Sequence, residues 1–309
     1  MAMIVLRKGN YSLGKKPEER SIKELLASGV VPIDKPCGPS SHEVSSILKK
    51  LVGASKSGHS GTLDPNVSGV LPVLLGKATK VAKIMTSSRK EYVCEATFER
   101  EITKKELEES LLSLQGEIYQ TPPLESAVKK ALRTRKVYSL EVLEHEGKKV
   151  LFKARVQAGT YIRTLISDAG LLAGVEARMS DLRRTVAAGI PIEKCVTLQE
   201  FSDRLWLATE KRKEGLLREC LLPVESVLRI KRVVVADGAV KNILSGSDVG
   251  ASVVDAIDEG ITQGELAGVF TGNGEIVCVA RALHDAVKIK QLPSHERLLD
   301  VERVLMQCP

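Results

Sequence analysis

The pattern of apolar and polar positions predicts a mixture of strands and helices in the first 200 residues. Residues 29–39, GVVPIDKPCGP, predict a short buried strand that ends in a proline and glycine turn. Residues 40–51 predict a helix, because apolar side chains recur at helical spacing and Ser40 with Glu43 has the spacing of a capping box. Residues 70–76, VLPVLLG, form a continuous apolar run, which is typical of a strand buried on both faces.

The next elements indicate the fold class. Residues 90–98, KEYVCEATF, alternate with period two and predict a strand whose apolar face includes Tyr92. Residues 103–118 predict a helix that begins with a second capping box and ends near Gly116. Strands and helices follow one another without a regular alternation. This order favours an α+β fold over a doubly wound sheet.

The pattern changes near residues 207–228, LATEKRKEGLLRECLLPVESVL, which predict a charged helix pair at the boundary of a second unit. From Arg229 the chain predicts short strands and one small helix that ends at Gly246. The segment TGNG at residues 271–274 predicts a tight turn between two of these strands. About 75 residues of this kind indicate a small β-rich barrel.

Length and composition limit the class of protein. The chain has 309 residues, of which 43% are apolar and 28% charged, so it is long enough for one large domain and a smaller one. No apolar run approaches the ~20 residues that cross a bilayer, and the first residues have too short an apolar run for a signal peptide. We therefore expect a cytoplasmic protein with no membrane partner. The six cysteines are scattered without a CxxC pair or zinc-ligand spacing, so we expect reduced thiols and no metal site.

The net charge of +7 favours a polyanionic partner. Aromatic residues make up only 3%, which is too few for a surface that stacks many single-stranded bases. The basic charge concentrates at residues 129–136, KKALRTRK, which no acidic residue interrupts. A solvated charged face is the ordinary interpretation of such a run, but the uncompensated repulsion favours contact with a phosphate backbone. The candidate phosphate contacts are Lys129, Lys130, Arg133, Arg135 and Lys136.

Residues 58–69, GHSGTLDPNVSG, crowd three glycines, a proline, a histidine and an aspartate into a segment without apolar periodicity. Because the proline ring disfavours the α region for its predecessor, Asp64 lies on an extended, shaped loop. Such a loop is either a demanding turn or a functional site. In a tight loop a histidine such as His59 is more often a hydrogen-bonded turn residue than a base. The GxSxG elbow of serine hydrolases and the GxxxxGK[ST] phosphate loop are both absent from the sequence.

Residues 158–170, AGTYIRTLISDAG, predict a helix that begins near Thr160 and carries Arg163 in its first turn. A cation at that position opposes the helix macrodipole by up to ~1 kcal/mol. Arg163 is therefore either a surface side chain that tolerates this cost or the partner of a carboxylate or phosphate.

Six segments, taken in order, closely resemble the TruB and dyskerin family of RNA pseudouridine synthases. They are GVVPIDKPCGPSSHEV, GHSGTLDPNVSGVLPVLLGKATK, KEYV, PPLESAVKKALRTRKVY, AGTYIRTLI and MSDLRRT. The resemblance covers residues 18–200. RTRKVY, the PEERSIKEL lead-in and the absence of lysine-rich tails are most similar to the archaeal catalytic subunit of box H/ACA ribonucleoproteins. The segment from Arg229 more loosely resembles a PUA domain, the RNA-binding appendage of this family.

The resemblance implies a pseudouridine synthase fold, built on a mixed, mainly antiparallel central sheet, plus a small β-barrel-like PUA domain. The reaction detaches uracil from C1′ of its ribose, turns the base over and rejoins it through C5. Because no atom or electron is gained or lost, it requires no cofactor or metal. The resemblance implies that Asp64 is the catalytic carboxylate, which either attacks C1′ or takes a proton from the sugar, and that Arg163 pairs with it.

The resemblance also implies roles for residues around Asp64. Tyr92 corresponds to the active-site tyrosine that stacks on the target base, and Leu182 corresponds to an apolar wall of the uracil pocket. We expect His59 to shape the loop and to touch RNA. The target nucleotide must be flipped out of the folded RNA to reach this pocket. In the PUA segment we expect RNA contacts at Lys231, Arg232 and Lys241.

Two positions depart from the family pattern. Glu125 stands where the archaeal branch usually has a basic residue, and Glu265 stands where the PUA pattern leads us to expect aspartate. Each departure weakens an expected RNA contact.

We expect a catalytic domain at residues 18–226 and a PUA domain at residues 229–305, with residues 1–17 packed on the latter. The expected partners are RNA (H/ACA guide RNA, rRNA and tRNA) and small accessory proteins. A catalytically idle RNA-binding scaffold is an alternative, against which Asp64, Tyr92 and Arg163 argue. A glycosidase would need a second carboxylate, which no motif supplies. The sequence does not decide between guided action on rRNA and stand-alone synthesis of pseudouridine-55 in the tRNA T-loop.

Overall fold

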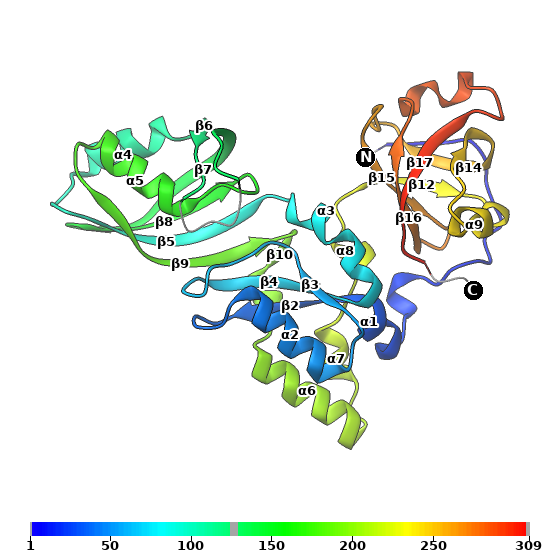
Figure 1. The fold of residues 1–309 in the computed structure, drawn as a ribbon, viewed down its shortest axis with the longest axis horizontal. Coiled ribbons are helices and arrows are strands. Elements are labelled where there is room, and N and C mark those ends of the chain that lie inside the picture. Colours follow the sequence, from blue (N-terminus) through cyan, green and yellow to red (C-terminus); the bar gives the residue numbers. More distant parts are fainter. Residues whose placement is uncertain (1, 124–128, 307–309) are drawn as a thin grey trace. The chain divides into compact units, whose positions relative to one another are not determined.

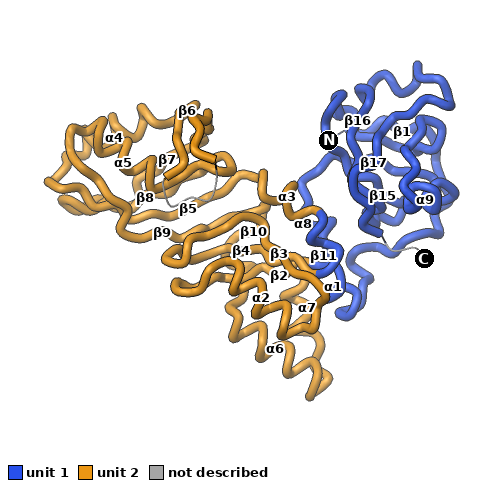
Figure 2. Tube along the Cα trace, in the orientation of Figure 1, with its two compact units in different colours: residues 1–29, 76–80, 222–309 blue, residues 30–75, 81–221 orange. Residues whose placement is uncertain are grey.

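The computed structural model describes residues 2–123 and 129–306. The chain divides into two compact units (Figure 2). The larger unit contains residues 30–75 and 81–221, and the smaller unit contains residues 1–29, 76–80 and 222–309. Figure 1 labels the helices and strands of both units.

The larger unit combines a sheet with helices. Its strands are β2 (Gly29–Lys35), β3 (Ser57–His59), β4 (Ser68–Leu75), β5 (Lys90–Phe98), β6 (Gly116–Gln120), β7 (Arg133–Glu146), β8 (Lys149–Val156), β9 (Ala177–Ala187) and β10 (Ile190–Pro191). Its helices are α2 (Ser41–Val52), α3 (Ala82–Thr86), α4 (Lys104–Ser113), α5 (Ile162–Leu172), η3 (Ile192–Lys194), α6 (Leu198–Lys211) and α7 (Gly215–Glu219).

The sheet of the larger unit has the order β2-β4-β9-β5-β8-β7-β6, with β3 paired to β4 and β10 paired to β9. Strands β4 and β9 are parallel, and the other neighbours are antiparallel. Strand β5 lies between β8 and β9, so Cys94 is level with both Phe152 and Leu182. This mixed, mainly antiparallel sheet confirms the predicted α+β class.

Local sequence signals explain where the elements begin. The Ser40 side chain accepts the backbone N–H of Glu43 in a capping box before α2, and Thr103 does the same before α4. Strand β4 is buried along almost its whole length, as its unbroken apolar run predicted. The predicted helix 103–118 is too long, because α4 ends at Ser113 and Gly116 adopts a φ of +102° at the start of β6.

A single apolar cluster joins the sheet to helices α4 and α5. It includes Phe98, Phe152 and Leu165, with Tyr92 packed against its edge. A small apolar cavity remains inside this cluster, lined by Ala96, Leu107 and Ala169 among others. The alternation of β5 produces this arrangement, since Cys94, Ala96 and Phe98 are all buried on one face.

The prediction of a charged helix pair at 207–228 is wrong in its bounds. Helix α6 already begins at Leu198, after a capping box formed by Thr197 and Glu200. The short helices α7 and α8 (Val224–Val227) follow it. The prediction missed this start because the capping box lies before the charged segment on which it was based.

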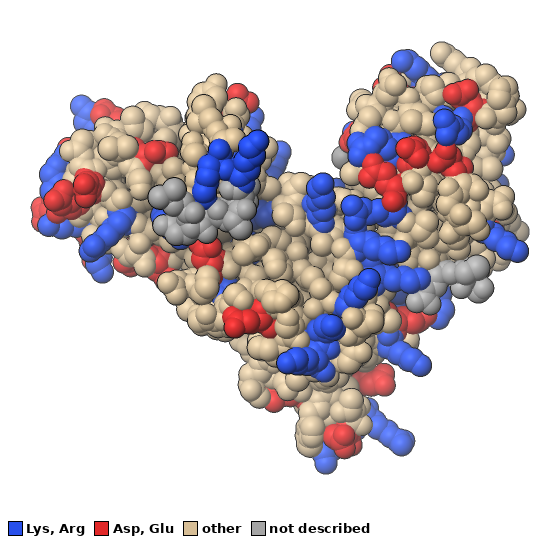
Figure 3. Space-filling model, in the orientation of Figure 1, with Lys and Arg blue, Asp and Glu red and all other residues tan. Residues whose placement is uncertain are grey.

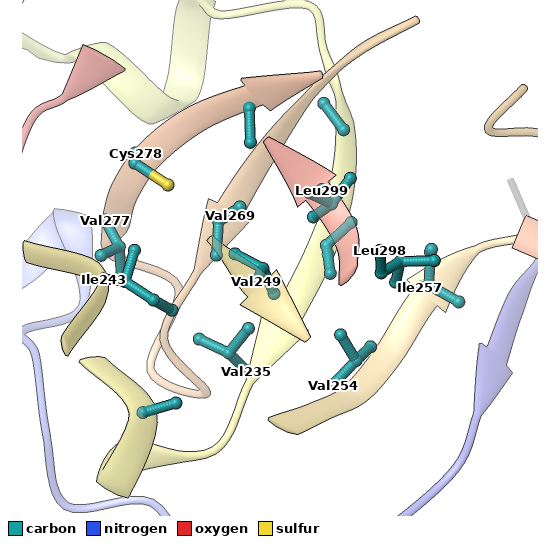
Figure 4. Close-up of a cluster of buried hydrophobic side chains, with 14 of the residues drawn as sticks. Val235, Ile243, Val249, Val254, Ile257, Val269, Val277, Cys278, Leu298 and Leu299 are labelled. Carbon is teal, nitrogen blue, oxygen red and sulfur yellow. The ribbon is translucent and has the colours of Figure 1, made fainter. Parts of the chain in front are cut away.

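The smaller unit is built mainly from short strands around one core (Figure 4). Its strands are β1 (Met3–Val5), β11 (Leu222–Pro223), β12 (Lys231–Val235), β13 (Val249–Gly250), β14 (Val254–Asp258), β15 (Leu266–Phe270), β16 (Ile276–Ala282) and β17 (Arg297–Val304). Its helices are η1 (Pro17–Glu19), α1 (Ile22–Ser28), α8, α9 (Asp237–Leu244), η4 (Ala251–Val253) and η5 (Ala286–Gln291), while η2 (Gly76–Val81) spans the 76–80 segment.

The sheet of the smaller unit has the order β1-β14-β12-β15-β16-β17-β13. The predicted tight turn is confirmed, because the N–H of Gly274 donates to the carbonyl of Thr271 between antiparallel strands β15 and β16. Figure 4 shows Val235, Val269 and Leu299 pointing into the shared core.

Residues near the N-terminus belong to this unit. Ile4 of β1 is level with Ile257 of β14, and the Asn273 side-chain amide donates to the carbonyls of Leu13 and Gly14. Residues 18–29 and 222–226, which the predicted bounds assign to the first domain, group with the smaller unit. The domain bounds 18–226 and 229–305 stay a prediction. In the described part of the chain, no helix has the length and apolar character needed to cross a membrane.

Candidate active site

The loop that carries Asp64 connects β3 to β4, and its backbone is held by buried side chains. The Ser41 hydroxyl, 1% exposed at the start of α2, donates to the Leu63 carbonyl at 3.0 Å and accepts the Leu63 N–H at 2.8 Å. Both polar groups of the residue before Asp64 are therefore fixed from the helix.

Two buried cations hold the rest of the loop. The Arg184 guanidinium on β9 donates to the carbonyls of Gly61 at 3.1 Å and Thr62 at 3.4 Å, and to that of Val70 at 2.8 Å. The Lys35 ammonium donates to the carbonyl of Pro65 at 3.1 Å and to two carbonyls of the turn after β2. Burial lowers the pKa of Lys35 because it removes water from the ammonium, and the three carbonyl groups replace part of that solvation.

The Asp64 side chain, in contrast, is 61% exposed and meets Arg163 from the first turn of α5, with 2.9 Å between Oδ2 and Nη2. The prediction that Arg163 faces a carboxylate is confirmed. Arg163 is itself 45% exposed, and ion pairs this accessible contribute at most ~1 kcal/mol to stability. Fold stability therefore does not explain the pair, whereas a fixed position for an accessible carboxylate does.

Tyr92 and Leu182 lie on neighbouring strands of the same sheet. Leu182 is 8% exposed in the apolar cluster that also contains Leu63 and Ile162, the neighbours of Asp64 and Arg163 in sequence. Tyr92 packs against this cluster. The structure thus brings these two predicted site residues to the apolar cluster that supports the ion pair.

His59 lies on β3, just before the loop. Burial, then the nearby charges of Arg184 and His42, lower the pKa of His59, so the imidazole is neutral at pH 7. Its Nδ1 is buried and has no hydrogen-bond partner among the described residues. The lowered pKa makes this imidazole a weak base, and its half-buried position agrees with a role in shaping the loop.

Lys90 is a feature that the sequence did not reveal. Its side chain is buried at the start of β5, and its ammonium donates to the carbonyls of Thr86 and Ser88. Burial, followed by the charge of Arg184, lowers the pKa of Lys90 to about 8. A Cβ placed on Gly61 would lie 3.7 Å from Nη1 of Arg184 and 3.8 Å from Cε of Lys90. The side chains of both cations therefore lie beside the loop.

The basic run leads into β7 in the same unit, and Figure 3 shows Lys and Arg side chains near β6 and β7. Lys129, Lys130 and Lys136 are exposed. Arg133 donates to the Lys129 carbonyl at 2.8 Å and Arg135 to the Thr134 carbonyl at 2.8 Å, so backbone dipoles hold both. Glu125 lies outside the described residues.

In the smaller unit, the predicted RNA contacts differ in their surroundings. Lys231 pairs with Glu265 at 2.7 Å, and the Arg232 guanidinium lies 4.5 Å from the centre of the Phe270 ring. Lys241 is exposed on α9. Arg232 and Lys241 are therefore both exposed, whereas Lys231 is half-buried beside Glu265.

Sequence reasoning gave no role to Ser41, Lys35 or Arg184, although all three stand inside or beside the family motifs. Their signal is the presence of a hydrophilic side chain on a strand or helix face that is otherwise apolar. In the residues that the structure describes, no three His, Cys, Asp or Glu side chains gather as a metal site.

Comparison with known proteins identifies the class of enzyme. The model of the TruB family pseudouridylate synthase N-terminal domain matches residues 49–110 and 98–162, and that of the tRNA pseudouridylate synthase B C-terminal domain matches residues 163–229. The DKCLD domain model matches residues 3–45, and the PUA domain model matches residues 231–305.

Whole-chain relatives agree with these matches. A probable tRNA pseudouridine synthase B of Pyrobaculum arsenaticum is 40% identical over 96% of this chain and 90% of its own, and one of Methanosarcina barkeri is 43% identical over 88% and 81%. The crystal structure of a Cbf5-Nop10-Gar1 complex contains a chain that is 38% identical, with a TM-score of 0.93 over 99% of this chain and 94% of that one. An H/ACA RNP bound to a substrate RNA containing 2′-deoxyuridine gives 36% identity and a TM-score of 0.91, over 99% of this chain and 95% of that one.

The fold and these matches define an RNA pseudouridine synthase, an isomerase. The chain belongs to the TruB family of pseudouridylate synthases, and it carries a PUA domain.

Proposed function

We propose that Asp64 is the catalytic carboxylate of this pseudouridine synthase and that Arg163 orients it. The observation that carries the proposal is the contrast at the loop: the backbone on both sides of Asp64 is fixed by buried groups, while its carboxylate is 61% exposed. A rigid support for an accessible, ionised group is what proximity catalysis requires.

The chemistry of the isomerisation needs only such a carboxylate and a pocket. The C1′–N1 bond breaks, the C1′–C5 bond forms, and the proton lost from C5 is balanced by one gained at N1. Asp64 either attacks C1′ or removes a sugar proton, and both roles require an ionised, accessible oxygen. Tyr92 stacks on the flipped uracil, and Leu182 forms part of the wall that excludes water from it. His59 shapes the loop.

We infer that the substrates are tRNA and, with guide RNA, rRNA. The relatives named above carry the name of probable tRNA pseudouridine synthase B. The similar structures are a Cbf5-Nop10-Gar1 complex and an H/ACA RNP bound to a substrate RNA. RNA and small accessory proteins are therefore the proposed partners, and the cytoplasm is the proposed location. The residues proposed to touch RNA are Lys129, Lys130, Arg133, Arg135, Lys136, Lys231, Arg232 and Lys241.

Replacement of Asp64 by Asn tests the catalytic assignment. The amide keeps the shape and a hydrogen bond to Arg163 but is neither a nucleophile nor a base. We expect pseudouridine formation to fall by at least about 10³-fold while RNA affinity stays within about twofold. Asp203→Asn, an exposed change on α6, is the matched control. Turnover at the rate of the unmodified enzyme in Asp64→Asn would disprove the assignment.

The substrate assignment needs a separate experiment. Pseudouridine is mapped in tRNA and rRNA after treatment with the purified protein, with and without guide RNA and accessory subunits. Modification of the tRNA T-loop by the protein alone supports stand-alone action. Modification of rRNA only when guide RNA is added supports guided action.

A further inference from the structure

Gln120, the last residue of β6, connects two distant parts of the larger unit. It is 3% exposed, and its side-chain amide makes two hydrogen bonds to one residue, Tyr161. Its Nε2 donates to the Tyr161 carbonyl at 3.1 Å, and its Oε1 accepts the Tyr161 N–H at 3.0 Å. A paired bond of this kind fixes both the distance and the rotation of the Tyr161 backbone.

Tyr161 is the N-cap residue of α5, two positions before Arg163. Helices α2, α4 and α6 are capped locally by Ser40, Thr103 and Thr197. A tyrosine cannot supply the short side-chain oxygen that caps a helix, so the start of α5 lacks this local device. The amide of Gln120 reaches the same backbone from another strand, while the Tyr161 carbonyl also accepts the N–H of Leu165 to begin the helical pattern.

We propose that Gln120 is a positioning residue for the isomerisation, because it holds the first turn of α5 where the Arg163 guanidinium meets Asp64. The proposal rests on the catalytic assignment of Asp64 and Arg163 above. The exposed ion pair is too weak to set its own geometry. Buried groups hold the Asp64 loop on one side of the pair, and Gln120 holds the helix on the other.

Two substitutions separate positioning from simple stability. Gln120→Met keeps the length and burial but removes both hydrogen bonds. With Arg163 displaced by ~1 Å, we expect kcat to fall by about 10- to 100-fold while KM for RNA stays within about threefold. Gln115→Met, an exposed change just before β6, is the control and keeps the full kcat.

Gln120→Glu gives a signature in pH that a merely structural role does not produce. An ionised carboxylate accepts the Tyr161 N–H but repels the Tyr161 carbonyl, whereas a protonated carboxyl makes both bonds. Two cations lie close to this position, because Arg133 of β7 is level with Gln120 and Arg163 follows Tyr161 by two residues in α5. Burial raises the pKa of a carboxyl at this 3% exposed position, whereas the two cations lower it, so the assay covers the range from pH 8 down to pH 5. Relative to the unmodified enzyme, the kcat of Gln120→Glu should recover at least about fivefold at the acid end, while Gln115→Glu shows no such recovery.

A readout independent of activity keeps this inference separate from the catalytic assignment. Amide hydrogen exchange at the start of α5 should be at least about tenfold faster in Gln120→Met than in Gln115→Met. Faster exchange with unchanged kcat would overturn the positioning role, and so would a loss confined to KM. If Gln120→Met does not fold, the pH recovery of Gln120→Glu decides, and a flat ratio from pH 5 to 8 overturns the proposal. An active Asp64→Asn enzyme would remove the catalytic assignment while leaving the exchange result valid.

Discussion

The buried ammonium of Lys90 makes the stability of the larger unit depend on pH in a defined direction. Lys90 is 6% exposed, its hydrogen-bond partners are Thr86 and Ser88, and its pKa falls from 10.5 to about 8. Between these two values the folded protein binds fewer protons than the unfolded chain. The free energy of unfolding therefore rises with pH in that window. Across the whole window, Lys90 alone contributes a rise of about 3 kcal/mol.

Replacement of Lys90 by Met removes this dependence. We expect the difference in unfolding free energy between the unmodified protein and Lys90→Met to change by about 2 kcal/mol between pH 7.5 and 10, in favour of the unmodified protein at the higher pH. Urea denaturation followed by circular dichroism measures it. The thiols of Cys94 and Cys195, whose burial raises the pKa to about 12, lower stability above pH 9, but they do so equally in both proteins and cancel in the difference.

Lys83→Met is the matched control, because Lys83 is exposed on the neighbouring helix α3. Its difference from the unmodified protein should stay constant with pH. Parallel stability curves for Lys90→Met and the unmodified protein would refute the argument, since they would mean that the ammonium retains its ordinary affinity for protons in the fold.

Three further changes test how the loop and the basic run work. Ser41→Ala leaves the buried N–H and carbonyl of Leu63 without their partner, so we expect a loss of about 1–3 kcal/mol in the free energy of unfolding, against no measurable change for the exposed Ser113→Ala. Gly69→Ala should prevent normal folding, because the φ of Gly69 is +108° and a Cβ would lie 2.2 Å from the Arg184 carbonyl oxygen. Soluble yield and melting temperature measure this effect. Gly215→Ala is the control and should be tolerated, because a Cβ there would meet open space. Replacement by Gln of four residues together, Lys129, Lys130, Arg133 and Arg135, should weaken RNA binding uniformly across sequences. It should also reduce the slope of log K against log salt by about 0.7–0.9 for each phosphate that the variant no longer neutralises. An unchanged slope in filter binding would mean that this run is only a solvated charged face.

The sequence alone predicted what depends on near neighbours along the chain. Capping boxes located the starts of α2 and α4, and the alternation of residues 90–98 gave β5 and its buried face. The proline after Asp64 and the helical stripe around Arg163 placed each residue in its correct local setting, because backbone preference and apolar periodicity act over a few residues. The order of the motifs then gave the family, and with it the pairing of Asp64 with Arg163.

Only the tertiary structure decided which groups hold that pair in place. Ser41, Lys35 and Arg184 act on the loop through backbone carbonyls and amides, and Gln120 reaches Tyr161 across 41 residues of chain. Every residue has a backbone carbonyl, so the residue type at a position does not indicate whether its carbonyl will accept a hydrogen bond from a distant side chain. The same holds for the pKa of Lys90, since burial is a property of the assembled fold. The local elements follow from short-range forces, whereas the rigidity of the site arises from hydrogen bonds that form only once distant segments are packed together.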